Sequence, residues 1–131
     1  MTQPLPVGGS APIVVGYSSK PEGRAALKRA IAEADLRAAE LIVVHTEPGS
    51  ELAELLAELA DADVRYDVRG SEGDIDPAEN LLSAADSSGA EFIVIGLRRR
   101  SPVGKLLLGS SAQRVLLDAT CPVLAVKAES S

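Results

Sequence analysis

Short apolar segments alternate with helical patterns along almost the whole chain, and this order restricts the possible folds more than any other feature. The runs at residues 12–16 and 41–44 are continuously apolar, which is typical of strands covered on both faces. Similar runs lie at residues 92–95 and 122–126, whereas residues 64–68 alternate and indicate an edge strand. The order β-α-β-α-β-α-β-α-β predicts an α/β fold, a three-layer sandwich with a mostly parallel sheet between helices.

The first two helices are predicted from start signals and apolar spacing. Residues 21–38 follow Ser19-Lys-Pro-Glu22, which has the spacing of a capping box with proline near the first helical position. Ser50, just after a Pro-Gly turn, can cap the second helix. The apolar faces of the two helices are predicted to comprise Leu27, Ile31, Ala34 and Ala38 in the first, and Leu52, Leu55, Leu56 and Leu59 in the second.

The third and fourth helices have equally clear starts. Asp76-Pro-Ala-Glu79 combines an Asx cap, a proline at the first position and an acid at the third, and Gly89 marks the stop. The last helix is predicted to begin at Ser110, where Ser110-Ser-Ala-Gln113 also has capping-box spacing.

Length and composition predict one domain with an aliphatic core. We expect a flexible lead-in over residues 1–11, a domain over residues 12–128 and a tail over residues 129–131 of the 131-residue chain. Aromatic residues make up only 2 %, so Leu, Val, Ile and Ala must fill the core. The net charge of −6 and the scarcity of aromatic rings argue against a nucleic-acid partner.

The same sequence predicts a cytoplasmic protein without a membrane partner. Cys121 is the single cysteine, so no disulfide can form within the chain. No apolar run approaches the roughly 20 residues of a membrane-spanning helix. Residues 1–11 lack the basic and apolar regions of a signal peptide. Cys121 has no metal-ligand spacing and is expected to pack in the core.

A basic segment near the C-terminus predicts an anionic ligand. Residues 92–117 contain five cations and no acid, although the whole chain carries a net charge of −6. In parallel sheets of this kind, ligands lie beyond the carboxyl ends of the strands. The residues expected near the ligand are therefore those at 17–19, 45–47 and 96–111. The five cations are Arg98, Arg99, Arg100, Lys105 and Arg114.

The spacing of glycines in this segment resembles a known family motif. Gly96-Leu-Arg-Arg99, nine further residues and Gly109-Ser110 are similar to the Gly-x2-Gly-x9-Gly-Ser/Thr pattern of the universal stress protein family. The stretches LLLGSSAQRVL and CPVLAV, the initial IVVG strand and the LIVVHT strand also fall where that family has them. The resemblance covers nearly the whole domain.

The family resemblance implies a fold, a ligand and an assembly. It implies a Rossmann-like sheet of the adenine nucleotide alpha-hydrolase type, with strand order 3-2-1-4-5. It implies a stress-response regulator or sensor that binds ATP, ADP or AMP, with Mg²⁺ present only if ATP is bound. It also implies a homodimer formed through the last strand, at residues 122–126, which opens at Pro122 and ends at Val126.

The resemblance also implies where the nucleotide would lie. Gly96 would let the strand end approach the ribose and phosphates, while Gly109 and Ser110 would close on the phosphates. Val15 and Thr46 would lie at the adenine and ribose, and Ile95 would line the base pocket. The full set of implied site residues is Val15, Tyr17, Thr46, Ile95, Gly96, Arg98, Arg99, Gly109, Ser110 and Ser111.

Two residues depart from the family pattern. Tyr17 stands where the nucleotide-binding branch has an acid that helps to hold metal and ribose, and Arg99 stands where the motif has its second glycine. Bulk at Arg99 could block the close backbone approach that glycine permits, or its guanidinium could bind phosphate. The Tyr17 ring could stack on adenine. Both departures make a metal less expected here than in the orthodox branch.

No residue pattern predicts an enzyme. His45 is the single histidine, and no nucleophile accompanies it, so we expect it to be structural or to line the site. Any ATP hydrolysis would be very slow, because no base is positioned for a water nucleophile. The alternative function is a nucleotide-free homologue that acts as a dimeric protein-interaction module, and Tyr17 and Arg99 favour it.

Overall fold

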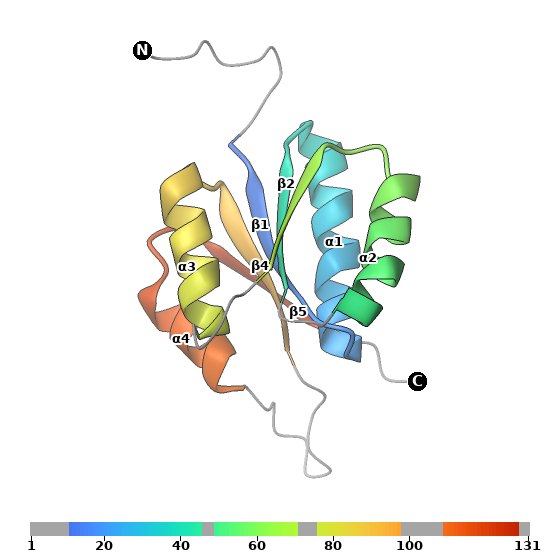
Figure 1. Ribbon diagram of the computed structural model, residues 1–131. Coiled ribbons are helices and arrows are strands. Elements are labelled where there is room, and N and C mark those ends of the chain that lie inside the picture. The colour runs from blue at the N-terminus through green and yellow to red at the C-terminus, as the bar shows by residue number, and fades with distance from the viewer. Residues whose placement is uncertain (1–10, 46–48, 71–75, 98–108, 129–131) are drawn as a thin grey trace.

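The computed structural model describes residues 11–45, 49–70, 76–97 and 109–128. In these ranges five strands alternate with four helices (Figure 1). None of these helices has the length and apolar character that a membrane span requires. The elements are β1 (Ile13–Tyr17), α1 (Pro21–Arg37), β2 (Leu41–His45), α2 (Gly49–Asp61), β3 (Tyr66–Gly70), α3 (Pro77–Ser88), β4 (Phe92–Leu97), α4 (Ser110–Asp118) and β5 (Val123–Lys127).

The strands form one parallel sheet in the order β3-β2-β1-β4-β5, as the family resemblance implied. Every neighbouring pair is parallel, and β1 lies at the centre with Tyr17 in register with His45 of β2. The two halves of the sheet grow outward from β1, so the strand order changes direction between β1 and β4. That change opens a crevice at the carboxyl ends of the two strands, where such folds hold their ligands.

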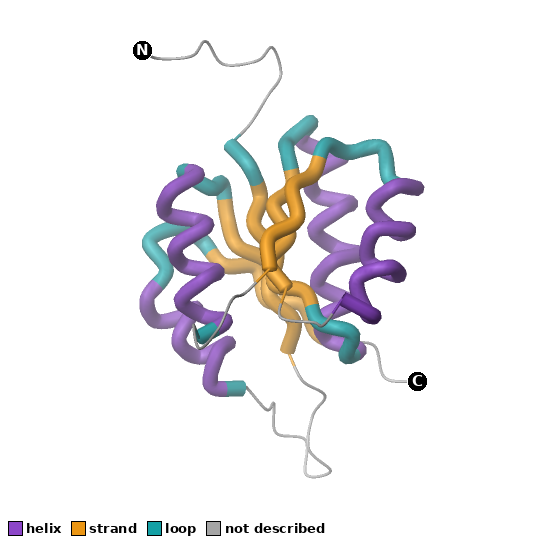
Figure 2. The backbone as a smooth tube through the Cα atoms, in the orientation of Figure 1, coloured by secondary structure: helices purple, strands orange, loops and turns teal. Residues whose placement is uncertain are grey.

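Helices cover both faces of the sheet (Figures 1 and 2). On one face, Ile13, Val15 and Tyr17 of β1 pack in a cluster with residues of α1 and α2, such as Leu27. On the other face, Val14 packs with residues of α3 and α4. Successive residues of a strand point to opposite faces, so β1 contributes to both clusters. The predicted three-layer sandwich is confirmed.

The predicted start of α1 at residue 21 is confirmed, but the N-cap lies one residue after the Ser19 of the capping-box pattern. Lys20 is the N-cap, its side chain makes no capping hydrogen bond, and Pro21 is the first helical residue. A residue that precedes proline is driven into the extended region, and Lys20 has φ −73° and ψ 159°. Proline geometry therefore prevailed over the Ser19 pattern. At the other end, Ala38 adopts a left-handed conformation as the C-cap and does not belong to the buried face.

Other boundaries divide in the same way between confirmed and wrong predictions. The Asp76 side chain accepts a 3.0 Å hydrogen bond from the Ala78 amide, and Gly89 ends α3 in the left-handed region, both as predicted. The predicted start of α4 at Ser110 is confirmed, but the capping-box spacing does not locate the cap, because Gly109 is the N-cap.

Two expectations about α2 and β3 also need correction. Leu55 and Leu59 are fully buried, but Leu56 is 41 % exposed and does not share their face. The edge position predicted for the third strand is confirmed, although β3 spans Tyr66–Gly70 rather than residues 64–68. Val64, just before β3, still packs against the core.

Candidate functional site

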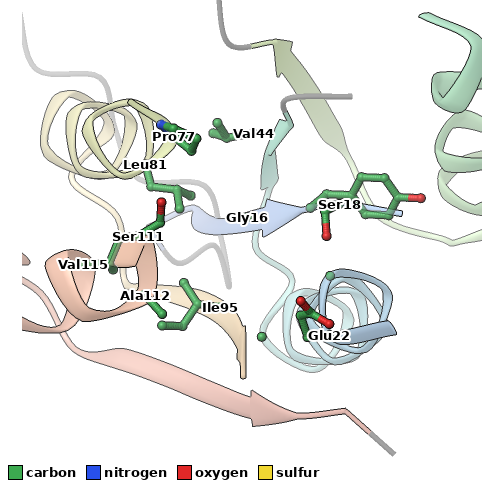
Figure 3. Close-up of a pocket in the computed structure, with 13 residues that line it drawn as sticks. Gly16, Ser18, Glu22, Val44, Pro77, Leu81, Ile95, Ser111, Ala112 and Val115 are labelled. Atoms are coloured by element: carbon green, nitrogen blue, oxygen red, sulfur yellow. The ribbon is translucent and has the colours of Figure 1, made fainter. Parts of the chain in front are cut away.

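A cavity of about 170 Å³ lies at the carboxyl ends of β1 and β4, in the crevice that the strand order creates (Figure 3). The first turns of α1, α3 and α4 surround it. Its volume is below the roughly 300–1,000 Å³ of pockets that enclose a drug-sized ligand, so a nucleotide would fill it with only part of its structure. Its lining comprises Gly16, Tyr17, Ser18, Glu22, Gly23, Val44, Pro77, Leu81, Ile95, Gly96, Ser111, Ala112 and Val115.

One wall of the cavity is apolar. Leu81 of α3, Ile95 of β4 and Val115 of α4 come from three different elements and meet there (Figure 3). Gly16 allows this approach, because a Cβ built on it would lie 3.0 Å from the Leu81 Cδ1 atom. An apolar wall of this kind can cover the face of a planar base and exclude water from it.

The opposite wall is polar and comes from the connection between β1 and α1. Ser18 and Glu22 lie there, facing the apolar wall across the cavity (Figure 3). Two glycines fix the wall in place. A Cβ on Gly23 would lie 2.3 Å from the Ser18 hydroxyl oxygen, and a Cβ on Gly96 would lie 1.9 Å from the Glu22 carbonyl oxygen. Any larger residue at either position would clash with these neighbouring atoms.

The N-terminus of α4 also faces the cavity, and its partial positive charge is not neutralised by its own first turn. The N-cap is Gly109, which has no side chain that could cap the helix, and the first turn contains no acid. By contrast, α3 is capped by the Asp76 carboxylate and has Glu79 in its first turn. Uncapped amides at a helix N-terminus can bind an anion. Ser111, in the first turn of α4, lines the cavity.

Arg114 holds α4 against the start of α3. Its guanidinium lies 3.1 Å from Glu79, 3.3 Å from Asp76 and 3.4 Å from Asp118. The hydrogen bond with Glu79, followed by the attraction of that carboxylate, raises the pKa of Arg114. Arg114 was counted in the basic segment, but these carboxylates neutralise it. Its role in the fold is to align the two helix starts that border the cavity.

The structure brings several of the predicted site residues to this cavity. Tyr17, Ile95, Gly96 and Ser111 line it. Val15 instead is fully buried between the sheet and α1. Gly109 and Ser110 form the start of α4 but do not line the cavity. The remaining three predicted residues, Thr46, Arg98 and Arg99, lie outside the described residues.

Tyr17 lies differently from the expectation that its ring stacks on adenine. The side chain is only 6 % exposed and belongs to the core cluster between the sheet and α1 and α2. It shares that face with Ile13 and Val15, because alternate residues of a strand point the same way. Tyr17 still contributes to the cavity lining, as does Ser18, the residue that follows it.

Sequence reasoning missed part of the polar wall and most of the apolar one. Ser18 lies within residues 17–19, which were expected near the ligand, and it lines the cavity. Glu22 was interpreted only as part of a helix start, and Leu81 only as a residue on the apolar face of a helix. One available signal was the strand alternation through Ile13, Val15 and Tyr17, which directs Tyr17 into the core. The tertiary contacts of Gly23 and Gly96 have no local signature in the sequence.

His45 and Cys121 lie apart from the cavity lining. His45 is 8 % exposed and stands beside Tyr17 in the sheet, and its Nδ1 atom has no hydrogen-bond partner within the part of the chain that the structure describes. Cys121 packs against the α3–α4 cluster, and burial raises the pKa of its thiol. Among the described residues, no group of His, Cys, Asp and Glu side chains is arranged to hold a metal ion.

A second hollow, of about 610 Å³, lies between α1 and β5. It is larger than the cavity at the strand ends, but none of the predicted site residues line it. Its walls come mainly from Arg24, Lys28 and Arg29 of α1 and from Lys127 of β5, and Arg24 and Arg29 already form ion pairs with Glu54 and Glu33.

Comparisons with known proteins agree with this architecture. A model of the universal stress protein family matches residues 46–127. A universal stress protein of Mycolicibacterium smegmatis is 47 % identical over 126 residues, which cover 88 % of this chain and 96 % of that protein. A universal stress protein structure from Archaeoglobus fulgidus has a TM-score of 0.73 and 31 % identity, covering 90 % of this chain and 99 % of its own. The structure of an Archaeoglobus fulgidus universal stress protein in complex with dAMP has a TM-score of 0.63 and 26 % identity, and the match covers 90 % of this chain and 98 % of that chain.

Proposed function

The chain belongs to the universal stress protein family, and we propose that it binds an adenine nucleotide in the cavity at the carboxyl ends of β1 and β4. The observation that carries the proposal is the meeting of an uncapped α4 N-terminus with an apolar wall in one cavity. A nucleotide needs both, since its base is planar and largely apolar and its phosphate is anionic. The dAMP complex of a similar protein supports the same ligand class.

In this proposal each part of the nucleotide has its own partner. The base packs against Leu81, Ile95 and Val115, where water is excluded. The phosphate lies at the N-terminus of α4 and accepts hydrogen bonds from amides that no side chain caps, with the Ser111 hydroxyl beside them. Arg98 and Arg99 are proposed as further phosphate partners, and Thr46 as a partner of the base and ribose. Mg²⁺ would accompany the ligand only if that ligand is ATP.

We propose a binding role without rapid turnover. Among the described lining residues, Glu22 is the one side chain that could act as a general base, and no histidine or cysteine lines the cavity with it. A nucleotide that is bound and not consumed suits a stress-response regulator whose state depends on occupancy. Hydrolysis of ATP, if it occurs, is expected to be very slow.

We further propose that the protein acts as a homodimer through β5. This strand is at the edge of the sheet, paired on one side with β4, so its other side can pair with a second strand. Ala125 is exposed in the middle of the strand. Two copies related by a two-fold axis could continue the sheet through this edge.

The alternative remains a dimeric interaction module that binds no nucleotide. The small cavity and the placement of Tyr17 in the core, with no acid at that position, are the observations that favour it.

The two functions are separated by testing the purified protein for nucleotide. The protein would be denatured, the chain removed, and any released nucleotide identified by chromatography and mass; calorimetry with AMP, ADP and ATP would follow. Retained adenine nucleotide, or saturable binding of any of the three, supports the proposal. A protein that carries none and binds none at millimolar concentration contradicts it and favours the interaction module.

A further inference from the structure

Glu22 is the single charged side chain among the described residues that line the cavity. Its carboxylate takes part in none of the ion pairs found among the described residues, whereas Glu33 of the same helix pairs with Arg29 and Arg37. Glu22 is half-buried and is held close to Gly96 through its carbonyl group. The cavity therefore has an anchored hydrogen-bond acceptor on one wall, which nothing in the phosphate-binding role of α4 requires.

Ser18 extends this acceptor surface. Its hydroxyl group lies against Gly23, close enough that a Cβ there would be 2.3 Å from the oxygen. Figure 3 shows Ser18 and Glu22 on the same side of the cavity, opposite Ile95 and Ala112. A carboxylate and a neighbouring hydroxyl suit a ligand that presents hydroxyl donors.

The cavity is thus electrostatically polarised. Each helix start carries a partial positive charge, but the acid Glu22 offsets it in the first turn of α1, whereas the first turn of α4 contains no acid. An anionic group is therefore more stable at α4 than at α1. A ligand with an anionic end and a hydroxyl-bearing end is favoured in the orientation that places its anionic end at α4.

We propose that Glu22 and Ser18 bind the ribose hydroxyl groups of the nucleotide, so that the site selects ribonucleotides by their free 2′- and 3′-hydroxyls. This inference rests on the proposed nucleotide function and specifies its chemistry. Carboxylates are suited to this role because both ribose hydroxyls can donate to them, as in dinucleotide-binding folds. Glu22 and Ser18 then act as specificity-determining residues in place of an acid at the position of Tyr17.

The test compares AMP with 2′,3′-dideoxy-AMP by calorimetry, in the wild type and in Glu22→Ala, Ser18→Ala and Asp35→Asn. The last variant is the control, since it removes an exposed acid of the same helix that does not line the cavity. In the wild type and the control, AMP is expected to bind about tenfold or more tightly than the dideoxy analogue, because charged hydrogen bonds are lost with the hydroxyls. In Glu22→Ala the preference is expected to fall to about one, with Ser18→Ala between.

The comparison of two ligands separates hydroxyl recognition from general charge. Removing Glu22 lowers the repulsion of phosphate equally for both nucleotides, so only the ratio of the two affinities reports on the hydroxyls. A wild type that binds both ligands equally, or a Glu22→Ala variant that keeps the full preference, overturns the inference while nucleotide binding stands. A wild type that binds neither ligand overturns the proposed function together with the inference.

Discussion

Gly96 of β4 lies so close to Glu22 of α1 that a Cβ built on it would stand 1.9 Å from the Glu22 carbonyl oxygen. This contact joins a strand end to a helix start on the polar wall of the cavity. The family motif assigns Gly96 to ligand approach, whereas the contact makes the same glycine a requirement of packing within the protein itself.

Gly96→Ala is therefore expected to destabilise the protein even without ligand. Because the added methyl group meets backbone, which cannot rotate away, we expect a loss of at least about 2 kcal/mol in the free energy of unfolding. Chemical denaturation measures it. Gly70→Ala is the matched control, since its Cβ would lie 3.5 Å from the His45 ring, an ordinary contact. Equal effects of the two substitutions would contradict the packing role of Gly96.

Gly109→Asp should have opposite effects on stability and binding. Gly109 has φ −69° and ψ 163°, which any residue can adopt, and aspartate is a favourable N-cap. We expect a gain of a few tenths of a kcal/mol in stability. The carboxylate should also occupy the amides and repel phosphate, so nucleotide binding should be lost.

Gly109→Asn provides the comparison for this experiment. It caps the helix with a side chain of nearly the same shape but without charge, so calorimetry should show weaker binding than in the wild type and stronger than in Gly109→Asp. If Gly109→Asp bound nucleotide as tightly as the wild type, the phosphate would have to lie elsewhere.

Arg114→Gln should loosen the attachment of α4 to α3. The guanidinium contacts three exposed carboxylates, and their attraction is screened by salt. We expect a lower midpoint of thermal unfolding at low ionic strength and a much smaller difference in about 1 M NaCl, where the Debye length is about 3 Å. A difference that persists unchanged in high salt would indicate lost packing rather than lost ion pairs.

Ala125→Glu is the substitution that should most directly weaken the proposed dimer. Val123 and Leu124 both pack partly against the core, so a charge at either would also disturb the fold. Ala125 is exposed, and a charge there would oppose the edge of a second copy. Sedimentation should show a shift toward monomer, whereas Ala53→Glu, an exposed position on α2, should sediment as the wild type. Identical profiles for both variants would argue against the β5 interface.

Glu33 should contribute a pH-dependent part of the stability. A hydrogen bond from Arg29, at 2.7 Å, and a second from Arg37 lower the pKa of Glu33. A carboxyl group with a lowered pKa stabilises the folded state above its unfolded pKa, and this stabilisation is lost as the pH falls through the folded pKa. Glu33→Gln should thus be less stable than the wild type near pH 7.

The difference between Glu33→Gln and the wild type should shrink in acid. Below about pH 4, the unperturbed range of glutamate, the Glu33 carboxyl group of the unfolded chain takes up a proton, and the folded one does so only at lower pH because its pKa is lowered. Urea unfolding at several pH values measures the change. A constant difference across that range would contradict the role of the Arg29 and Arg37 contacts.

Local signals predicted most of the fold, and one of them explains both a success and an error. Lys20 and Asp76 each precede a proline and each became an N-cap in the extended conformation. At Asp76 the proline rule and the capping side chain agree, so the prediction was right. At Ser19 they disagree by one residue, and the proline rule prevailed.

The candidate site was less predictable because it depends on contacts between distant elements. The motif indicated the strand end at Gly96 and the start of α4 at Ser110, and both border the cavity region. The polar wall depends on Gly23 lying against Ser18 and on Gly96 lying against Glu22. No sequence spacing indicates these contacts, since they arise only when α1 folds back onto the sheet.

The starts of α1, α3 and α4 converge on one cavity, although α1 lies on one face of the sheet and α3 and α4 on the other (Figure 1). A molecule seated there would contact both outer layers at once. Its binding would link the two helical layers to each other at the carboxyl ends of the strands. Hydrogen exchange of amides in the first turns of both α1 and α4 would then slow when ligand binds. Occupancy of one small cavity would thus stabilise helices on both faces of the sheet.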